Sequence, residues 1–322
     1  MTATCQRRGP VTLLNVDYKI LARCIAKRIE PFLPKLIHSD QTGFMKDRFI
    51  GQNVRRLNDL MEYIRMWRRS RAFFFLSDFE KVFDSIERNF IKRSLELFNL
   101  GSFLTRWFSI LYNNSEAVVM NAGYMTDYFT VSRGVRQGYP LSPFLFILSL
   151  ELLALKIRQE PNCKGISLPN LQEPKISQFA DDTTLISKDT NSLKFSLQII
   201  GSFGSISGLG LNKKKTKAMW IGSSKHEKTK ILELHSIKDP IKILGAHLSY
   251  NTAKNNDANF FSKIRKMKNK PLENAWSYAF WQIRSSQDAW CLSVNLHCFT
   301  NDCPWCSNTR GSKPPVLVFL EK

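Results

Sequence analysis

The run Ala-Phe-Phe-Phe-Leu at residues 72–76 constrains the fold more than any other feature of this sequence. Consecutive apolar residues, most of them aromatic, are typical of a strand that other elements cover on both of its faces. Such a strand requires a substantial core, which a chain of 322 residues with 43% hydrophobic content can supply. The strand stops just before Asp78, so it would carry a carboxylate to one end of a buried sheet.

Two further carboxylates stand between apolar segments that predict another pair of strands. Residues 176–180 and 183–187 fit two strands joined by a tight turn at Asp181 and Asp182. Only the fold can bring this pair close to Asp78. Neighbouring strands lie about 4.8 Å apart, so carboxylates at the ends of such strands would lie around one small volume. Two divalent cations about 3.5–4 Å apart require ligands in such an arrangement. An Asp-Asp dipeptide by itself more often forms a turn or caps a helix.

The rest of the chain alternates between helical and extended patterns, which predicts an α+β fold. Apolar residues at helical spacing predict helices at residues 14–29, 54–64, 90–98, 103–111, 142–155 and 193–208. Further strands are expected at residues 117–121 and 128–131, as a hairpin, and at 217–221 and 241–248. Pro31 and Pro34 would end the first helix, Ser142 would cap the apolar one, and Gly208 would stop the last. The order of elements suggests helices on one face of a sheet.

The charge balance indicates a polyanionic partner. Lysine and arginine number 47 against 27 acidic residues, a formal net charge of +20. Such a chain is expected to bind nucleic acid, because each phosphate that a basic side chain neutralises releases counterions. An anionic membrane surface would attract the same basic chain. The longest apolar run, residues 144–155, is shorter than the ~20 residues of a membrane helix, and residues 1–10 do not resemble a signal peptide. Seven scattered cysteines favour a reduced, intracellular protein.

Seven segments, in a fixed order, carry a family resemblance. The segment FLSDFEKVFD at residues 75–84 resembles motif A of the reverse transcriptases of non-LTR (LINE-type) retrotransposons. The other six are GVRQGYPLSP at 134–143 (motif B), FADDT at 179–183 (motif C), LNKKKT at 211–216 (motif D), IKILG at 241–245 (motif E), and the fingers motifs at 10–20 and 40–50. One departure is Gly9, which separates Arg8 from Pro10 where the family has adjacent arginine and proline.

The resemblance implies a right-hand polymerase architecture. Residues 10–70 would form part of the fingers and residues 71–250 a ferredoxin-like palm with an antiparallel sheet. Residues 251–322 would hold a truncated thumb and an irregular tail, which we interpret as frame-shifted sequence. The implied enzyme is an RNA-directed DNA polymerase in the nucleus and/or cytoplasm. It would take an RNA template, a DNA primer, deoxynucleoside triphosphates and two Mg²⁺ ions.

Two other functions remain open at this point. A truncated thumb would also suit an inactive retrotransposon remnant that only binds nucleic acid. A two-metal nuclease would account for the acidic residues but not for the other motifs.

The resemblance also implies roles for single residues. Asp78, Asp181 and Asp182 would hold the two ions, with the first two as the most direct ligands. Phe83 would be the ribose gate, whose ring excludes a 2′-hydroxyl, although a plain core phenylalanine is the other interpretation. Gln137 and Gly138 would lie beside the incoming nucleotide. Arg48, or equally Lys46, would neutralise the triphosphate. Lys215 or a neighbour would lie near the leaving pyrophosphate.

Several of these residues also fit ordinary structural roles. Gln137 and Gly138 suit a turn before a helix, and Lys215 suits a solvated basic segment. Asp84 and Glu80 of motif A are expected to be structural or helix-capping residues. Cys303 and Cys306, with His297 nearby, form one Cys-x-x-Cys pair only, which favours a role other than zinc binding.

Overall fold

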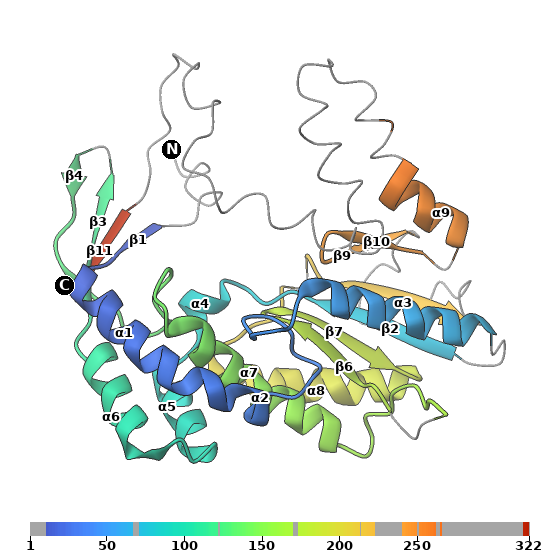
Figure 1. Cartoon of the computed structure of the whole chain (residues 1–322), viewed down its shortest axis with the longest axis horizontal. Coiled ribbons are helices and arrows are strands. Elements are labelled where there is room, and N and C mark those ends of the chain that lie inside the picture. The colour runs from blue at the N-terminus through green and yellow to red at the C-terminus, as the bar shows by residue number, and fades with distance from the viewer. Residues whose placement is uncertain are drawn as a thin grey trace.

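A four-stranded antiparallel sheet forms the centre of the protein, in the order β6-β7-β2-β8 (Figure 1). The computed structural model describes residues 11–66, 71–121, 123–169, 173–212, 214–222, 240–249, 251–261, 265 and 318–321. The strands of the sheet are β2 (Arg71–Ser77), β6 (Ile176–Phe179), β7 (Asp182–Ser187) and β8 (Lys217–Gly222). The apolar run at 72–76 therefore lies in an inner strand, as the sequence predicts.

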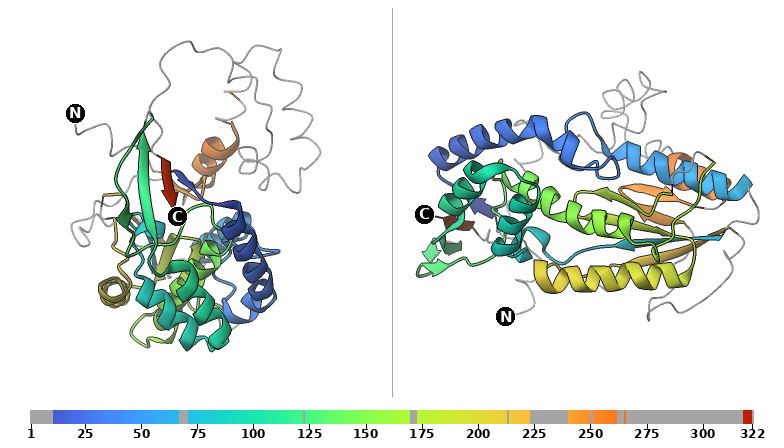
Figure 2. Two further views of the ribbon diagram at one scale, coloured as in Figure 1. Left: turned by 90° about the vertical axis from the view of Figure 1, so that its left-hand side faces the viewer. Right: turned by 90° about the horizontal axis from the view of Figure 1, so that it is seen from below.

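Alternate side chains of β2 enter two separate hydrophobic cores, because successive residues of a strand point to opposite faces. Phe73 packs in the core that includes α7 (Ser142–Gln159) and α8 (Thr190–Ser207). Phe74 packs in a second core with α3 (Ile50–Met66). Figure 2 shows α3 and α8 on opposite sides of the sheet. The prediction that helices cover one face is therefore wrong, since a strand as apolar as β2 requires cover on both.

Helix α7 is buried over most of its surface, so the longest apolar run of the chain is part of the core. Its first residue is Ser142 and its N-cap is Leu141, so the prediction that Ser142 caps the helix is wrong by one position. The Ser142 hydroxyl instead lies 3.1 Å from the hydroxyl of Tyr112. In the described part of the chain, no helix combines the length and the apolar character needed to cross a membrane.

Three other helices of the N-terminal half lie close to their predicted positions, namely α1 (Val16–Ile29), α5 (Arg88–Leu97) and α6 (Gly101–Tyr112). The sequence pattern does not predict the short helices α2 (Leu33–Leu36) and α4 (Val82–Ser85). Pro31 and Pro34 do more than end the first helix. Each stands in the first turn of a further helical element, the 3-10 turn Glu30–Phe32 and α2, where the missing proline N–H is no loss.

A second sheet contains the predicted hairpin. Strand β3 (Glu116–Asn121) pairs antiparallel with both β4 (Tyr124–Met125) and β5 (Phe129–Thr130). Strand β11 (Val318–Glu321) lies between β3 and β1 (Val11–Leu13). The hairpin is thus confirmed, with its returning strand divided in two.

Residues 241–248 form a hairpin rather than the single strand that the sequence suggests. Strands β9 (Ile241–Ile243) and β10 (Ala246–Leu248) are joined by Leu244 and Gly245, both with positive φ, which reverses the chain. Helix α9 (Thr252–Asn256) and a π-helical turn at Asp257–Phe261 follow. Most of the tail predicted to be frame-shifted lies outside the described residues.

Helix α8 ends as predicted, and its start provides a stability test. It ends before Gly208, which has a left-handed φ of 77°, and at its start the Asp189 carboxylate accepts a hydrogen bond from the Ser192 N–H at 2.8 Å. We expect Asp189→Ala to lower the free energy of unfolding by about 1 kcal/mol, the usual cost of losing an N-cap acceptor. Denaturant unfolding measures the loss. An equal loss in Asp189→Ser, which keeps a capping oxygen, would contradict this explanation.

Candidate active site

The three predicted metal-binding carboxylates lie at the same end of two adjacent strands. Asp78 directly follows β2, and Asp181 and Asp182 lie at the turn that joins β6 to β7. Ser77 pairs with Thr183 across β2 and β7, so Asp78 leaves the sheet beside this turn. The fold therefore brings together carboxylates that are far apart in the sequence.

Burial and neighbouring negative charge together raise the pKa values of Asp181 and Asp182. The pKa of Asp182 rises to about 6, mainly because surrounding protein atoms bury its carboxylate and further because of the charges of Asp181 and Asp78. Asp182 as a whole residue nevertheless remains exposed. The pKa of Asp181 is also raised, first by burial and further by the charge of Asp78. Lys215 opposes both shifts, and its Nζ lies 3.4 Å from Oδ2 of Asp78.

An oxygen-donor cluster of this kind suits a hard divalent cation. Mg²⁺ binds one or two carboxylates and takes its other ligands from water and substrate phosphates. A cation beside Asp78 and Asp181 would offset the repulsion that raises the pKa of Asp181. Within the ranges that the structure describes, no three histidine, cysteine, aspartate or glutamate side chains form a ligand group on their own. The donors thus fit a cation that is shared with a phosphate-bearing substrate.

The raised pKa of Asp182 predicts a decrease in stability as the pH rises through the weakly acidic range. Because the pKa rises from 3.8 to about 6, the folded chain binds more protons than the unfolded chain between these values. The free energy of unfolding contributed by this group therefore falls from about pH 4 to about pH 6 and stays low above that. Asp182→Asn removes the contribution, so the variant should gain stability relative to the parent near neutral pH but not near pH ~4. Thermal denaturation in metal-free buffer measures the difference, and a difference independent of pH would contradict the shift.

A basic cavity of about 350 Å³ opens beside Asp78 and Asp182. Its cationic lining residues are Lys214, Lys215, Lys217 and Lys242. An ammonium group binds phosphate as a point charge, so lysines next to carboxylates suit a phosphate that also touches a cation. Lys215, already paired with Asp78, lies where the resemblance places a cation for pyrophosphate.

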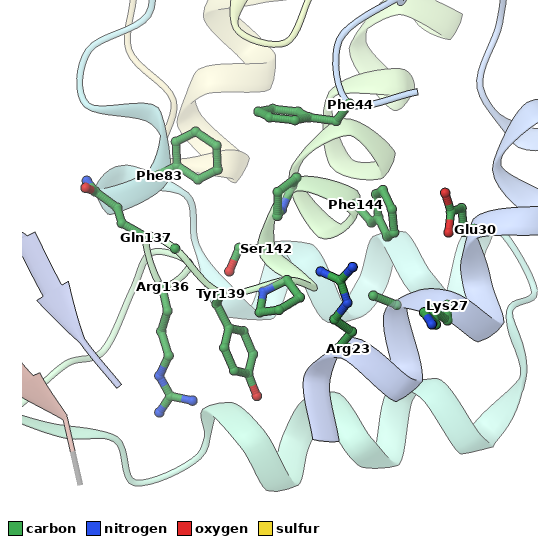
Figure 3. A pocket seen from close by; sticks show the side chains of 14 residues that line it. Arg23, Lys27, Glu30, Phe44, Phe83, Arg136, Gln137, Tyr139, Ser142 and Phe144 are labelled. Carbon is green, nitrogen blue, oxygen red and sulfur yellow. The ribbon is translucent and has the colours of Figure 1, made fainter. Parts of the chain in front are cut away.

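A larger cavity of about 780 Å³ lies against Phe83 (Figure 3). Phe83 is half-buried, and its ring centroid lies 5.2 Å from that of Phe146 and 6.3 Å from that of Phe44. Arg23 and Lys27 of α1 line the same cavity (Figure 3). An aromatic ring and cations around one space suit a nucleotide, whose base stacks and whose phosphates carry negative charge. Phe83 therefore lines a cavity and also packs against the hydrophobic core.

The loop at Gln137 and Gly138 lines this cavity as well. Gln137 Nε2 donates a hydrogen bond to Oδ1 of Asp84 at 3.3 Å, so Asp84 contacts a side chain of the loop. Gly138 has a φ of 74°, a conformation that favours glycine. Glu80 is exposed, and its N–H donates to the Gly210 carbonyl at 2.9 Å. The contact of Asp84 is thus made by its side chain, whereas that of Glu80 involves only its backbone.

Arg48 is engaged in a different way from the predicted one. Its guanidinium donates to the carbonyl groups of His38 and Gln41, both at 2.7 Å, and of Ile37 at 3.1 Å. These bonds hold a loop together and direct the donors at backbone rather than at a phosphate. Lys46, the other candidate in this segment, is exposed. The Arg48 donors, by contrast, are occupied by backbone carbonyl groups in this structure.

Arg136 has a role that the sequence pattern does not reveal. It is buried next to Gln137 and donates to the Leu111 carbonyl at 2.7 Å and to the Ser115 hydroxyl at 3.0 Å. Its guanidinium also lies over three aromatic rings, those of Tyr18, Tyr112 and Tyr139. Because Arg136 directly precedes Gln137, these contacts fix the backbone of the Gln137 loop. Most of the partners come from distant segments, so no local pattern indicates them.

Comparison with known proteins decides the family. Residues 4–248 match the family described as reverse transcriptase (RNA-dependent DNA polymerase). The chain belongs to this family. The chain is 30% identical over 216 residues to the transposon TX1 uncharacterized 149 kDa protein of Xenopus laevis, and the match covers 67% of this chain and 16% of that protein. It is 29% identical over 220 residues to the Pol polyprotein of the type-1 retrotransposable element R2 of Popillia japonica, which covers 67% of this chain and 30% of that protein.

The predicted resemblance to retrotransposon reverse transcriptases is thus confirmed, and this chain spans less than a third of the length of these two relatives. The α+β right-hand polymerase fold is also confirmed. Telomerase from Candida Tropicalis, solved with a fragment of telomeric RNA, matches with a TM-score of 0.52 at 13% identity, over 76% of this chain and 38% of that chain. Likeness at this identity concerns the fold alone. Gly9, His297, Cys303 and Cys306 lie outside the described residues.

Proposed function

We propose that this chain is an RNA-directed DNA polymerase that adds deoxynucleotides to a DNA 3′ end by phosphoryl transfer with two Mg²⁺ ions. The observation that carries the proposal is the meeting of Asp78 with Asp181 and Asp182 at one end of adjacent strands. Carboxylates that repel one another at the rim of a basic cavity are arranged for cations that arrive with a phosphate substrate.

The residues of this cluster would have separate tasks. Bound magnesium would lower the pKa of the primer 3′-hydroxyl and stabilise the charge of the leaving pyrophosphate. Asp78 and Asp181 would be its direct ligands, and Asp182 would add negative charge from the next position. Lys215, now paired with Asp78, would turn toward the pyrophosphate when the nucleotide binds. The contribution of the protein is positioning and charge stabilisation, as in phosphoryl transfer generally.

Substrate selection would take place in the larger cavity. Phe83 would exclude a 2′-hydroxyl, and Gln137 with Gly138 would contact the incoming nucleotide. Residues 10–70 would act as part of the fingers and 71–250 as the palm. The net charge of +20 favours the RNA template and DNA primer as partners. The protein would act in the nucleus and/or cytoplasm.

A primer-extension assay tests the proposal. The purified chain, an RNA template with an annealed DNA primer, deoxynucleoside triphosphates and Mg²⁺ should together give a longer primer, and a chelator should abolish the extension. Binding of the template–primer without extension would indicate a protein that only binds nucleic acid. Shortening of either strand would indicate a nuclease. Both results would overturn the proposal.

A further inference from the structure

The side chain of Gln41 holds both backbone polar groups of Ala180, the residue directly before Asp181. The N–H of Ala180 donates to Oε1 of Gln41 at 2.9 Å, and Nε2 of Gln41 donates to the Ala180 carbonyl at 3.1 Å. The same Oε1 accepts a third hydrogen bond from the N–H of Gly43 at 2.8 Å. Gln41 is 1% exposed, so water does not compete for these contacts.

Ala180 needs such a constraint because of its backbone conformation. Phe179 pairs with Asp182, so Ala180 and Asp181 form a two-residue turn between β6 and β7. Ala180 has a φ of 54°, a left-handed conformation that L-residues other than glycine and asparagine rarely adopt. A strained residue of this kind persists only where the surrounding structure holds it in place. The hydrogen bonds of Gln41 are the contacts that do so here.

The segment that carries Gln41 is itself docked along β6. Gln41 and Gln178 form a parallel bridge, with Thr42 N–H donating to the Gln178 carbonyl at 3.0 Å. Gly43 approaches Ala180 so closely that a Cβ atom there would lie 2.1 Å from the Ala180 nitrogen. The position of the turn is therefore coupled to a loop that lies 139 residues earlier in the chain.

We propose that Gln41 is a positioning residue that locks the turn at Ala180, so that Asp181 and Asp182 face Asp78. This inference rests on the proposed function, because it assigns to Gln41 the geometry of the cation-binding carboxylates. The competing explanation is that Gln41 satisfies buried polar groups and contributes to stability alone.

Asn53 provides a matched control for that competing explanation. It is also a 1% exposed amide, and its Nδ2 donates to the Gln178 carbonyl at 2.8 Å and to the Ser177 hydroxyl at 3.0 Å. Its Oδ1 also accepts a hydrogen bond from the hydroxyl of Thr42, next to Gln41. Asn53 therefore fastens the same strand and the same segment, but it does not touch the turn residues. Gln41→Met and Asn53→Leu each remove buried amide hydrogen bonds while keeping the volume of the side chain.

The experiment measures Mn²⁺ binding by electron paramagnetic resonance in the presence of template–primer and a non-hydrolysable deoxynucleotide, because the cation is expected to share its ligands with the substrate phosphates. The melting temperature and primer extension are measured on the same preparations. We expect Gln41→Met to weaken Mn²⁺ binding about tenfold to a hundredfold, the usual effect of losing a residue that orients metal ligands. Primer extension should fall in parallel, through kcat rather than through the KM for template–primer. Asn53→Leu should lower the melting temperature and leave Mn²⁺ affinity near that of the parent. If Gln41→Met does not fold, Gln41→Asn, which keeps both amide polar groups on a shorter side chain, should show a smaller loss of Mn²⁺ affinity.

Two results would overturn the inference: parental Mn²⁺ affinity in the Gln41 variants, or an equal loss of affinity in Asn53→Leu. Failure of the proposed function is a separate outcome. A parent chain that binds Mn²⁺ but does not extend primers would contradict the polymerase proposal, while the comparison of variants would still decide the role of Gln41. A parent that binds no Mn²⁺ would contradict both.

Discussion

Asp181→Asn is expected to reduce primer extension about a hundredfold or more, while the protein keeps or gains thermal stability. The loss of rate follows from removing a charged group that stabilises the transition state, an effect that typically costs about 10²–10³ in kcat. The stability follows from the raised pKa of Asp181, since a carboxylate that is buried and also repelled by Asp78 destabilises the folded chain. Steady-state extension kinetics and thermal denaturation of the same preparation measure the two effects.

A matched control separates this effect from the general loss of a negative charge. Asp59 lies exposed on α3, where its Oδ2 is 3.9 Å from Nε of Arg55. Asp59→Asn should leave both rate and stability close to the parent values, because exposed ion pairs of this kind contribute little. A parental rate in Asp181→Asn, or an equal loss in Asp59→Asn, would show that the cluster is not the catalytic centre.

Phe83→Val is expected to reduce the preference for deoxynucleotides over ribonucleotides by about tenfold to two hundredfold, the range that shape selection in an apolar pocket can provide. The ring lines the larger cavity, and valine would leave space for a 2′-hydroxyl there. Valine also keeps part of the packing against Phe146, so the fold should survive. The ratio of kcat/KM values for a deoxynucleotide and its ribonucleotide measures the change.

Phe195 provides the control for the gate. It is 40% exposed on α8 and does not line the cavity. Phe195→Val should leave the ratio of kcat/KM values unchanged. If Phe83→Val loses activity with both sugars equally, the ring is a packing residue and the ribose-gate interpretation is wrong.

Elements with strong local signals could be predicted from the sequence. The apolar run in β2 marks an inner strand because five successive residues leave no face for water. Helix α8 ends before the left-handed Gly208 as predicted, whereas its start at Thr190, capped by Asp189, lies three residues before the predicted one. The tight turn at Asp181 and Asp182 is equally local. Their meeting with Asp78 depends on the pairing of β2 with β7, which the family resemblance implied and periodicity alone did not.

The features that could not be predicted depend on contacts between distant segments. The turn at Leu244 and Gly245 requires a positive φ at a non-glycine residue as well as at the glycine, and a single glycine within an apolar run is a weak turn signal. Arg48 satisfies loop carbonyl groups because the chain folds back on itself, which a motif position does not encode. The hydrogen bonds between Gln41 and Ala180 join residues that have no pattern in common. Short-range chemistry thus determines the elements, whereas tertiary packing decides which side chains reach the site.

An anomalous difference map from crystals with Mn²⁺, an RNA–DNA template–primer and a non-hydrolysable deoxynucleotide would test the central claim most directly. We predict two Mn²⁺ peaks about 3.5–4 Å apart, in contact with Asp78 and Asp181 and with the phosphates of the nucleotide. A bound nucleotide without metal at these carboxylates, or with its metal held by other residues, would contradict the claim.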